Sequence, residues 1–245
     1  MGHRVTTLNV NTIEPAGNTL TIGASGDTVV LADDVKANTY KDAGGNTLFV
    51  SNGSGTLSSV NSGFGDALKL LSTQTASNSA SLSFTSGIDS TYKEYIFKFY
   101  NMNPATQAVD FTFQVNASGQ SGFNEVMTTT YFQAYHYEDD GAAGQQYQTG
   151  RDQAQGTAYQ ILANHIGNGS DESVCGELHL FNPASTTYVK NFYSTMQEYY
   201  NDNTDSISEN NFIAGYINVT AAITQIDFKM SSGNFDGKIK MYGVT

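Results

Sequence analysis

The stretch Phe111-Thr112-Phe113-Gln114-Val115 indicates the fold most directly. Large apolar residues occupy every second position and polar residues lie between them, which is the pattern of a strand with one face in a core. Further β-like runs lie at residues 95–100, 127–137, 178–180, 189–200, 212–219, 226–230 and 239–242. Turns between them draw on Gly, Asn and Asp, since the chain has 24 Gly but only 3 Pro.

No long amphipathic helix is visible among these runs. Residues 67–72 could form a short helix, but we favour a strand because the poor helix formers Ser72, Thr73 and Thr75 continue the run. A series of about nine or ten strands without helical crossovers is typical of an antiparallel structure. The sequence therefore predicts an all-β protein whose main domain is a two-sheet, jelly-roll-like β-sandwich.

The N-terminal part has a different organisation, in which a short unit occurs twice. Asn18 and Asn46 begin the two copies, and each copy reads as a strand, a Gly/Ser-rich turn and a second strand. Because each unit has few large apolar residues, an isolated hairpin of this kind is only marginally stable. We expect the segment to pack against further copies of itself or against a partner; a flexible linker is the alternative.

A turn-rich stretch at residues 60–66 separates the two parts. We therefore predict an assembly or anchoring segment of β-hairpin repeats at residues 1–65 and the β-sandwich at residues 66–245.

Composition excludes several classes of function. The net charge is −12, so phosphate backbones and anionic membranes should repel the chain. No run approaches the roughly 20 apolar residues of a membrane helix, and the start of the chain lacks a signal-peptide pattern. We expect no nucleic-acid partner, no membrane insertion and folding in a cytoplasm. A single cysteine, Cys175, permits no internal disulfide.

Tyrosine-rich strands supply the candidate binding residues. In the run 131–137, Tyr131, Gln133, Tyr135 and Tyr137 share one face of a strand, and Phe132, Ala134 and His136 share the other. We expect the second set to face the core and the first to be exposed. In the run 191–200, Tyr193 and Tyr199 share a face with Thr195 and Gln197.

Tyrosine combines a ring that can stack on a sugar with a hydroxyl that can form a hydrogen bond. The predicted ligand-binding residues, with a saccharide or a receptor as the ligand, are Tyr131, Tyr135, Tyr137, Tyr193 and Tyr199. The alternative is that these tyrosines serve ordinary sheet and interface packing.

Motifs for catalysis and metal binding are absent or incomplete in the sequence. Asn201, Asn203 and Asp205 have the spacing of a calcium loop, but Ser206 and Phe212 stand where the motif needs Gly and Glu. A looser calcium site using Asp202, Asp205 or Glu209 stays open. No zinc motif, nucleophile elbow or phosphate loop occurs, and no pair of carboxylates stands out. We therefore predict no catalytic residues, no metal site and no cofactor.

Several segments resemble a domain found in structural proteins of marine tailed phages. These segments are Leu70–Ala76, Asp89–Phe99, Phe113–Asn116, Leu180–Pro183 and Lys240–Val244, while Asn11–Pro15 with Leu20–Gly23 resembles leader segments of phage fibre proteins. The resemblance covers most of the chain. It implies a component of a virus particle, often trimeric, and it transfers no catalytic residue.

Three functional hypotheses follow. The first is a trimeric tail fibre whose sandwich binds a host surface, and the second is a capsid-decorating protein. The third, from another class, is a tailspike-like enzyme that degrades host polysaccharide. Loss of polysaccharide turnover on substitution of a carboxylate such as Asp139 or Glu172 would support it. The first implies synthesis in the bacterial host cytoplasm, location on the virion, and as partners the chain itself as a homotrimer, other virion proteins and a host-surface saccharide.

Overall fold

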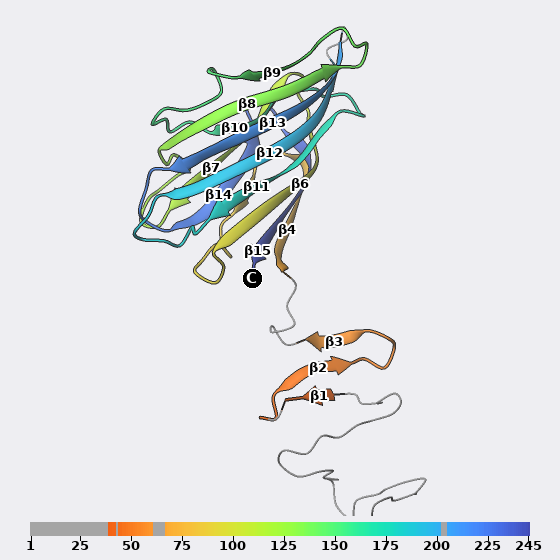
Figure 1. Cartoon of the computed structure of the whole chain (residues 1–245), viewed down its shortest axis with the longest axis vertical. Helices are drawn as coiled ribbons and strands as arrows, with labels where there is room; N and C mark the ends of the chain where they lie inside the picture. Colours follow the sequence, from red (N-terminus) through yellow and green to blue (C-terminus); the bar gives the residue numbers. More distant parts are fainter. Residues whose placement is uncertain (1–38, 43, 61–66, 202–204) are drawn as a thin grey trace, which may run out of the picture. The chain divides into compact units, whose positions relative to one another are not determined.

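The structure, a computed structural model, describes residues 39–42, 44–60, 67–201 and 205–245. The chain divides into two compact units, Met1–Ser62 and Gly63–Thr245. The turn-rich stretch predicted as the boundary lies almost wholly outside the described residues. Figure 1 shows the strands of each unit.

The described part of the first unit is a three-stranded antiparallel sheet. Its strands are β1 (Thr39–Lys41), β2 (Thr47–Ser51) and β3 (Leu57–Val60), in the order β1-β2-β3. The hairpin of β2 and β3 confirms the second copy of the predicted repeat, whereas the first copy lies outside the described residues. The short strand β1 was not predicted; its Tyr40 stacks on Phe49 of β2 with ring centroids 4.4 Å apart.

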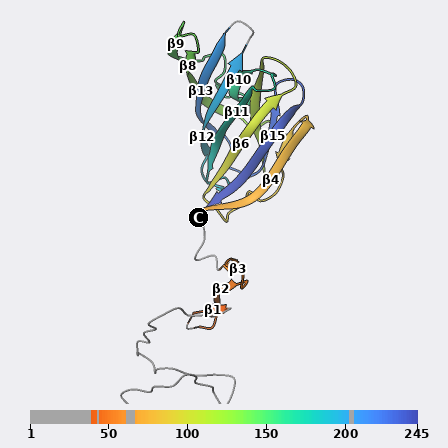
Figure 2. The same ribbon diagram turned by 90° about the vertical axis from the view of Figure 1, so that its right-hand side faces the viewer.

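The second unit consists of two antiparallel sheets that pack face to face. The eight-stranded sheet has the order β4-β15-β6-β11-β12-β13-β8-β9 and curls, as Figure 2 shows from the side. Its strands are β4 (Leu68–Ser79), β6 (Glu94–Pro104), β8 (Met127–Tyr137), β9 (Ala143–Tyr147), β11 (Ser173–Phe181), β12 (Lys190–Asn201), β13 (Ser206–Ile217) and β15 (Phe235–Val244). The four-stranded sheet has the order β10-β7-β14-β5, with β5 (Leu82–Phe84), β7 (Val109–Ala117), β10 (Gln160–Ile166) and β14 (Ile223–Met230).

This arrangement confirms the predicted all-β, antiparallel sandwich preceded by a hairpin, and residues 68–72 form a strand as expected. Strands β5, β9 and β10 escaped prediction. Strand β5 has only three residues, and every residue of β9 is exposed, so that it lacks an apolar alternation. No helix in the described part of the chain is long and apolar enough to cross a membrane.

Phenylalanine side chains from both sheets fill the centre of the sandwich. Phe228 of β14 is fully buried, and the centroid of its ring lies 5.2 Å from that of Phe99 and 5.5 Å from that of Phe97, both on β6. Phe111 and Phe113 flank it on the neighbouring strand β7. Edge-to-face and offset contacts of this kind stabilise a core beyond the area that they bury. Phe228 is thus the centre of an aromatic cluster that joins the two sheets.

The polar residues of β7 correct one expectation from the sequence. Thr112 and Gln114 alternate with phenylalanine and should face water, yet both are buried. The two N–H groups of the Gln114 amide are shared among the carbonyl oxygens of Glu125, Thr157 and Ala158, which lie 3.0, 3.1 and 3.0 Å from Nε2. The chain therefore covers the outer face of β7, and Gln114 binds the covering backbone.

Substitution of Phe228 tests the aromatic cluster. We expect Phe228→Ala to lower the free energy of unfolding by about 3–5 kcal/mol, because it leaves a cavity between the sheets. The matched control is Phe132→Ala, since Phe132 is 40% exposed on β8 and its loss should cost about 1 kcal/mol or less. Denaturant unfolding followed by circular dichroism measures both, and equal costs would contradict a core centred on Phe228.

Candidate functional site

The two faces of β8 are assigned the other way round from the sequence prediction. Tyr131 and Gln133 are buried, Tyr135 and Tyr137 are half-buried, and Phe132 is exposed. The predicted grouping of residues by face is right, but the tyrosine face points into the sandwich. Contacts on both sides of the strand explain this orientation. On the outer side, Phe132 stacks on Phe212 of β13, and on the inner side the Tyr131 hydroxyl donates a hydrogen bond to Asn164.

Between the two sheets the packing changes from aromatic to polar. The Tyr131 hydroxyl lies 2.6 Å from Asn164 Oδ1 on β10 and 2.7 Å from Asn211 Oδ1 on β13. All three side chains are buried. Because a buried polar group without a partner is costly, these contacts fix β10 against the inner face of β8 and β13.

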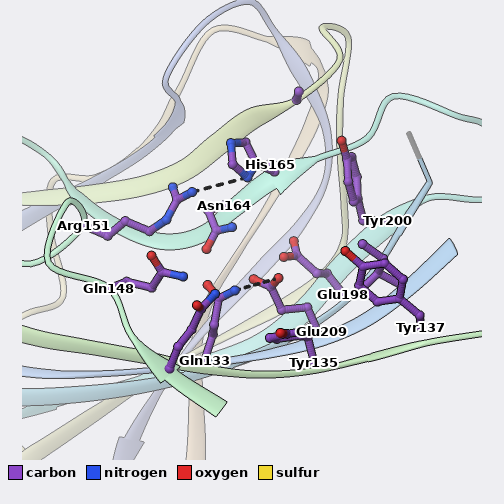
Figure 3. Close-up of a pocket in the computed structure, with 13 residues that line it drawn as sticks. Gln133, Tyr135, Tyr137, Gln148, Arg151, Asn164, His165, Glu198, Tyr200 and Glu209 are labelled. Carbon is purple, nitrogen blue, oxygen red and sulfur yellow. Dashed lines mark hydrogen bonds between the residues drawn. The ribbon is translucent and has the colours of Figure 1, made fainter. Parts of the chain in front are cut away.

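Next to this polar contact lies an open hollow of about 650 Å³ (Figure 3). The large sheet contributes Gln133, Tyr135 and Tyr137 from β8, Glu198 and Tyr200 from β12, and Ile207 and Glu209 from β13. The facing side consists of Gln148 and Arg151, from the segment between β9 and β10, with Asn164 and His165 of β10. Ala108 and Gln146 complete the lining. Most of the lining side chains are polar or aromatic.

Two carboxyl groups lie side by side on the sheet wall of the hollow. Glu198 and Glu209 are directly opposite each other on β12 and β13, and Figure 3 shows both beside Tyr135 and Tyr137. Burial, and then the charge of Glu209, raise the pKa of Glu198 well above its ordinary value of 4.5. Burial also raises the pKa of the half-buried Glu209. Glu198 is the more deeply buried of the two, so a proton on the pair favours Glu198 and a negative charge favours Glu209.

Amide groups connect this pair to its surroundings. Gln133 donates a hydrogen bond from Nε2 to Glu209 Oε2 at 3.2 Å, and Asn211 donates one from Nδ2 to Glu198 Oε1 at 3.3 Å. The carbonyl oxygen of Gln133, Oε1, is buried and accepts no hydrogen bond within the described part of the chain. A buried acceptor in this state is suited to a donor from water or from a ligand.

Arg151 provides the positive charge on the facing side. Its Nη1 lies 3.5 Å from Asp110 Oδ1, and its Nη2 lies 3.3 Å from His165 Nδ1 (Figure 3). A guanidinium has five N–H donors, so these two contacts leave further N–H groups that can donate to a ligand. Asp110 also offsets the charge of Arg151, so the carboxyl pair leaves the hollow with a small excess of negative charge.

The other predicted binding residues lie away from this hollow. Tyr193 is 42% exposed on the outer face of the large sheet, where its ring stacks on His179 with centroids 4.4 Å apart. His179 is in turn held between Glu94, at 2.6 Å, and Glu177, at 3.1 Å. Tyr199 lines a separate pocket with Glu172 and Asn201. Of the five predicted tyrosines, Tyr135 and Tyr137 line the hollow and Tyr131 lies buried beside it.

The carboxylates considered for an enzyme are also separate. Glu172 is buried and accepts backbone N–H groups of Gly169 and Asn201, so it holds a turn. Asp139 is exposed and accepts the N–H of Gly141. Neither lines the hollow.

Sequence reasoning missed Gln133, Arg151, Asn164, Glu198 and Glu209 as members of one site. Glu198 carries a readable signal, because it follows Phe192, Ser194 and Met196 on the inward face of its strand. A carboxyl at an inward position of a strand marks a candidate site. Arg151 and Asn164 carry no such signal, since only the packing of the two sheets brings them near.

For calcium, Asp202 of the candidate loop lies outside the described residues. Among the residues that are described, no group of three or more His, Cys, Asp or Glu side chains could hold a metal ion.

Comparison with family models, curated proteins and solved structures gives no match to this chain.

The carboxyl pair makes stability depend on pH. A carboxyl whose pKa is raised by folding stabilises fully below its ordinary pKa, and that contribution is lost as the pH rises towards the folded value. We therefore expect Glu198→Gln to have little effect near pH 4 and to raise the melting temperature relative to the wild type at pH 8. Thermal unfolding across this range measures the difference. The exposed Glu138→Gln is the control, and a pH-independent effect of Glu198→Gln would rule out a buried protonated carboxyl.

Proposed function

We propose that this chain is a non-enzymatic structural component of a tailed-phage particle, a trimeric tail fibre whose sandwich binds a host surface. The observation that carries the proposal is the contrast between its two units. One has a well-filled aromatic core and an open polar hollow, and the other is a small sheet with little core of its own.

The small sheet supports self-association. Leu57 is 54% exposed and Val60 is 48% exposed, although both belong to strand β3. A three-stranded sheet with its apolar side chains in water gains little from burial, and further copies of the chain would supply the missing contacts. Symmetric association through identical surfaces is the usual route to such contacts.

The carboxyl pair supports binding in preference to hydrolysis. Hydrolysis of a glycosidic bond uses two carboxyl groups that flank the bond, usually about 5–10 Å apart. Glu198 and Glu209 are instead neighbours on adjacent strands of one wall. In that position they can hold a ligand from one side, and the facing wall offers amides, Arg151 and His165 where the second carboxyl would be needed.

Capsid decoration is the second candidate, and the outer face of the large sheet favours it. Phe132 and Phe212 stack there with centroids 4.9 Å apart, and Tyr193 and Tyr100 are also exposed. Aromatic side chains across a sheet face are suited to contact with another protein. Binding of the purified protein to capsid shells but not to host cells would favour this candidate.

The solution mass tests the fibre. We expect the intact chain to be a trimer and a fragment of residues 63–245 to be a monomer, because the apolar side chains of β3 drive association. Analytical ultracentrifugation measures both masses.

The matched variant is the intact chain with Leu57→Ser and Val60→Ser, which should dissociate while the sandwich keeps its melting temperature. A monomeric intact chain would contradict the fibre and favour a decorating protein that orders its first unit on the particle. A trimeric fragment would place the association surface on the sandwich.

A further inference from the structure

We propose that the hollow between β8, β12 and β13 on one side and β10 on the other is a binding site for a neutral saccharide unit. This inference rests on the proposed function and names the site and the ligand class through which the sandwich would bind a surface. Of the tyrosines predicted from the sequence, Tyr135 and Tyr137 line the site and the other three do not. Tyr200, Gln133 and Arg151 line it as well.

The size and the aromatic surfaces fit a sugar. The volume, about 650 Å³, lies within the range of ligand-binding clefts, roughly 300–1,000 Å³. Tyr135 and Tyr137 lie with ring centroids 5.9 Å apart and an interplanar angle of 56°, and Tyr200 lies near them in Figure 3. Rings at such angles offer separate faces for the apolar C–H groups of a sugar, and their hydroxyls can bond the polar rim.

The polar groups present donors and acceptors together. Gln133, Gln148 and Asn164 each carry an amide with both kinds of group, and all three line the hollow. Glu209 adds a charged acceptor, and Arg151 adds donors opposite to it. Each sugar hydroxyl both donates and accepts a hydrogen bond, so a ring with several hydroxyls can satisfy such a mixed wall.

The charge balance disfavours an anionic ligand. Arg151 is already offset by Asp110, and two carboxyl groups lie on the opposite wall, so a phosphate or sulfate would meet more negative than positive charge. An apolar ligand would leave the amide and carboxyl groups without partners, which is costly in a partly buried site. A neutral polyol avoids both costs.

A glycan array probed with the intact, labelled protein tests the site. The array carries neutral saccharides, amine-bearing saccharides and carboxylate-bearing saccharides. We expect binding to neutral members, and calorimetry with the best of them should show at least a tenfold loss of affinity for Tyr135→Ala. Tyr135→Phe keeps the ring and should lose less, which separates loss of stacking from a failure to fold.

Tyr193→Ala is the matched control, because it removes an exposed tyrosine from the outer face of the same sheet. It should bind the glycan as the wild type does. If Tyr193→Ala abolishes binding and Tyr135→Ala does not, the ligand lies on the outer face and the hollow is not the site, while the fibre proposal stands. Binding only to charged saccharides, or to none on the array, would overturn the saccharide site; the solution mass of the intact chain decides the fibre independently.

Discussion

The sandwich depends on how its two sheets are joined, because each sheet alone would expose one apolar face. Around Phe228 the two sheets are held together by close packing of aromatic rings. Around Tyr131 the join is made of hydrogen bonds, which hold β10 and β8 at a fixed distance. Losing one partner of a buried hydrogen bond costs about 1–3 kcal/mol, so this polar contact is specific as well as stabilising. The hollow lies beside it, where the side chains between the sheets are polar and do not close the gap.

The alternation of apolar and polar residues along the sequence was enough to predict the main core strands. The alternation at Phe111–Val115 and at residues 226–230 identified strands that form the core, and the second hairpin repeat appeared where it was expected. The orientation of β8 was beyond the sequence, because hydropathy alone assigns Phe132 to the core. Its actual partner, Phe212, lies 80 residues further on, and the partner of Tyr131 is Asn164 in an unpredicted strand. Polar sites between sheets depend on register and on packing across the sandwich, which no local pattern contains.

A trimer with one hollow in each sandwich would bind a repetitive surface more tightly than a single site, because three weak sites would bind together. An open, polar site of this kind has to offset the freedom that a ligand loses on binding, so a single sugar unit should bind weakly. If the proposed trimer and saccharide site both hold, three such sites would raise the effective affinity for a repetitive surface by about 10²–10⁴ when they bind together. The small apolar sheet and the hollow would then serve one purpose, in which the first unit supplies the number of sites and the second supplies recognition.

The protonation state of Glu198 tests the polar interior most directly, because burial and a neighbouring carboxyl both raise the pKa of a glutamate. Carbon-13 labelling of glutamate carboxyl groups allows each to be followed by NMR as the pH changes, and the spectrum of Glu198→Gln assigns the resonance. We predict that the Glu198 carboxyl titrates well above the ordinary pKa of 4.5 and keeps the chemical shift of the protonated form at a pH where an ordinary glutamate has lost its proton. A resonance that titrates near the ordinary value of 4.5 would show a solvated carboxylate and would contradict a buried Glu198–Glu209 pair beside the hollow.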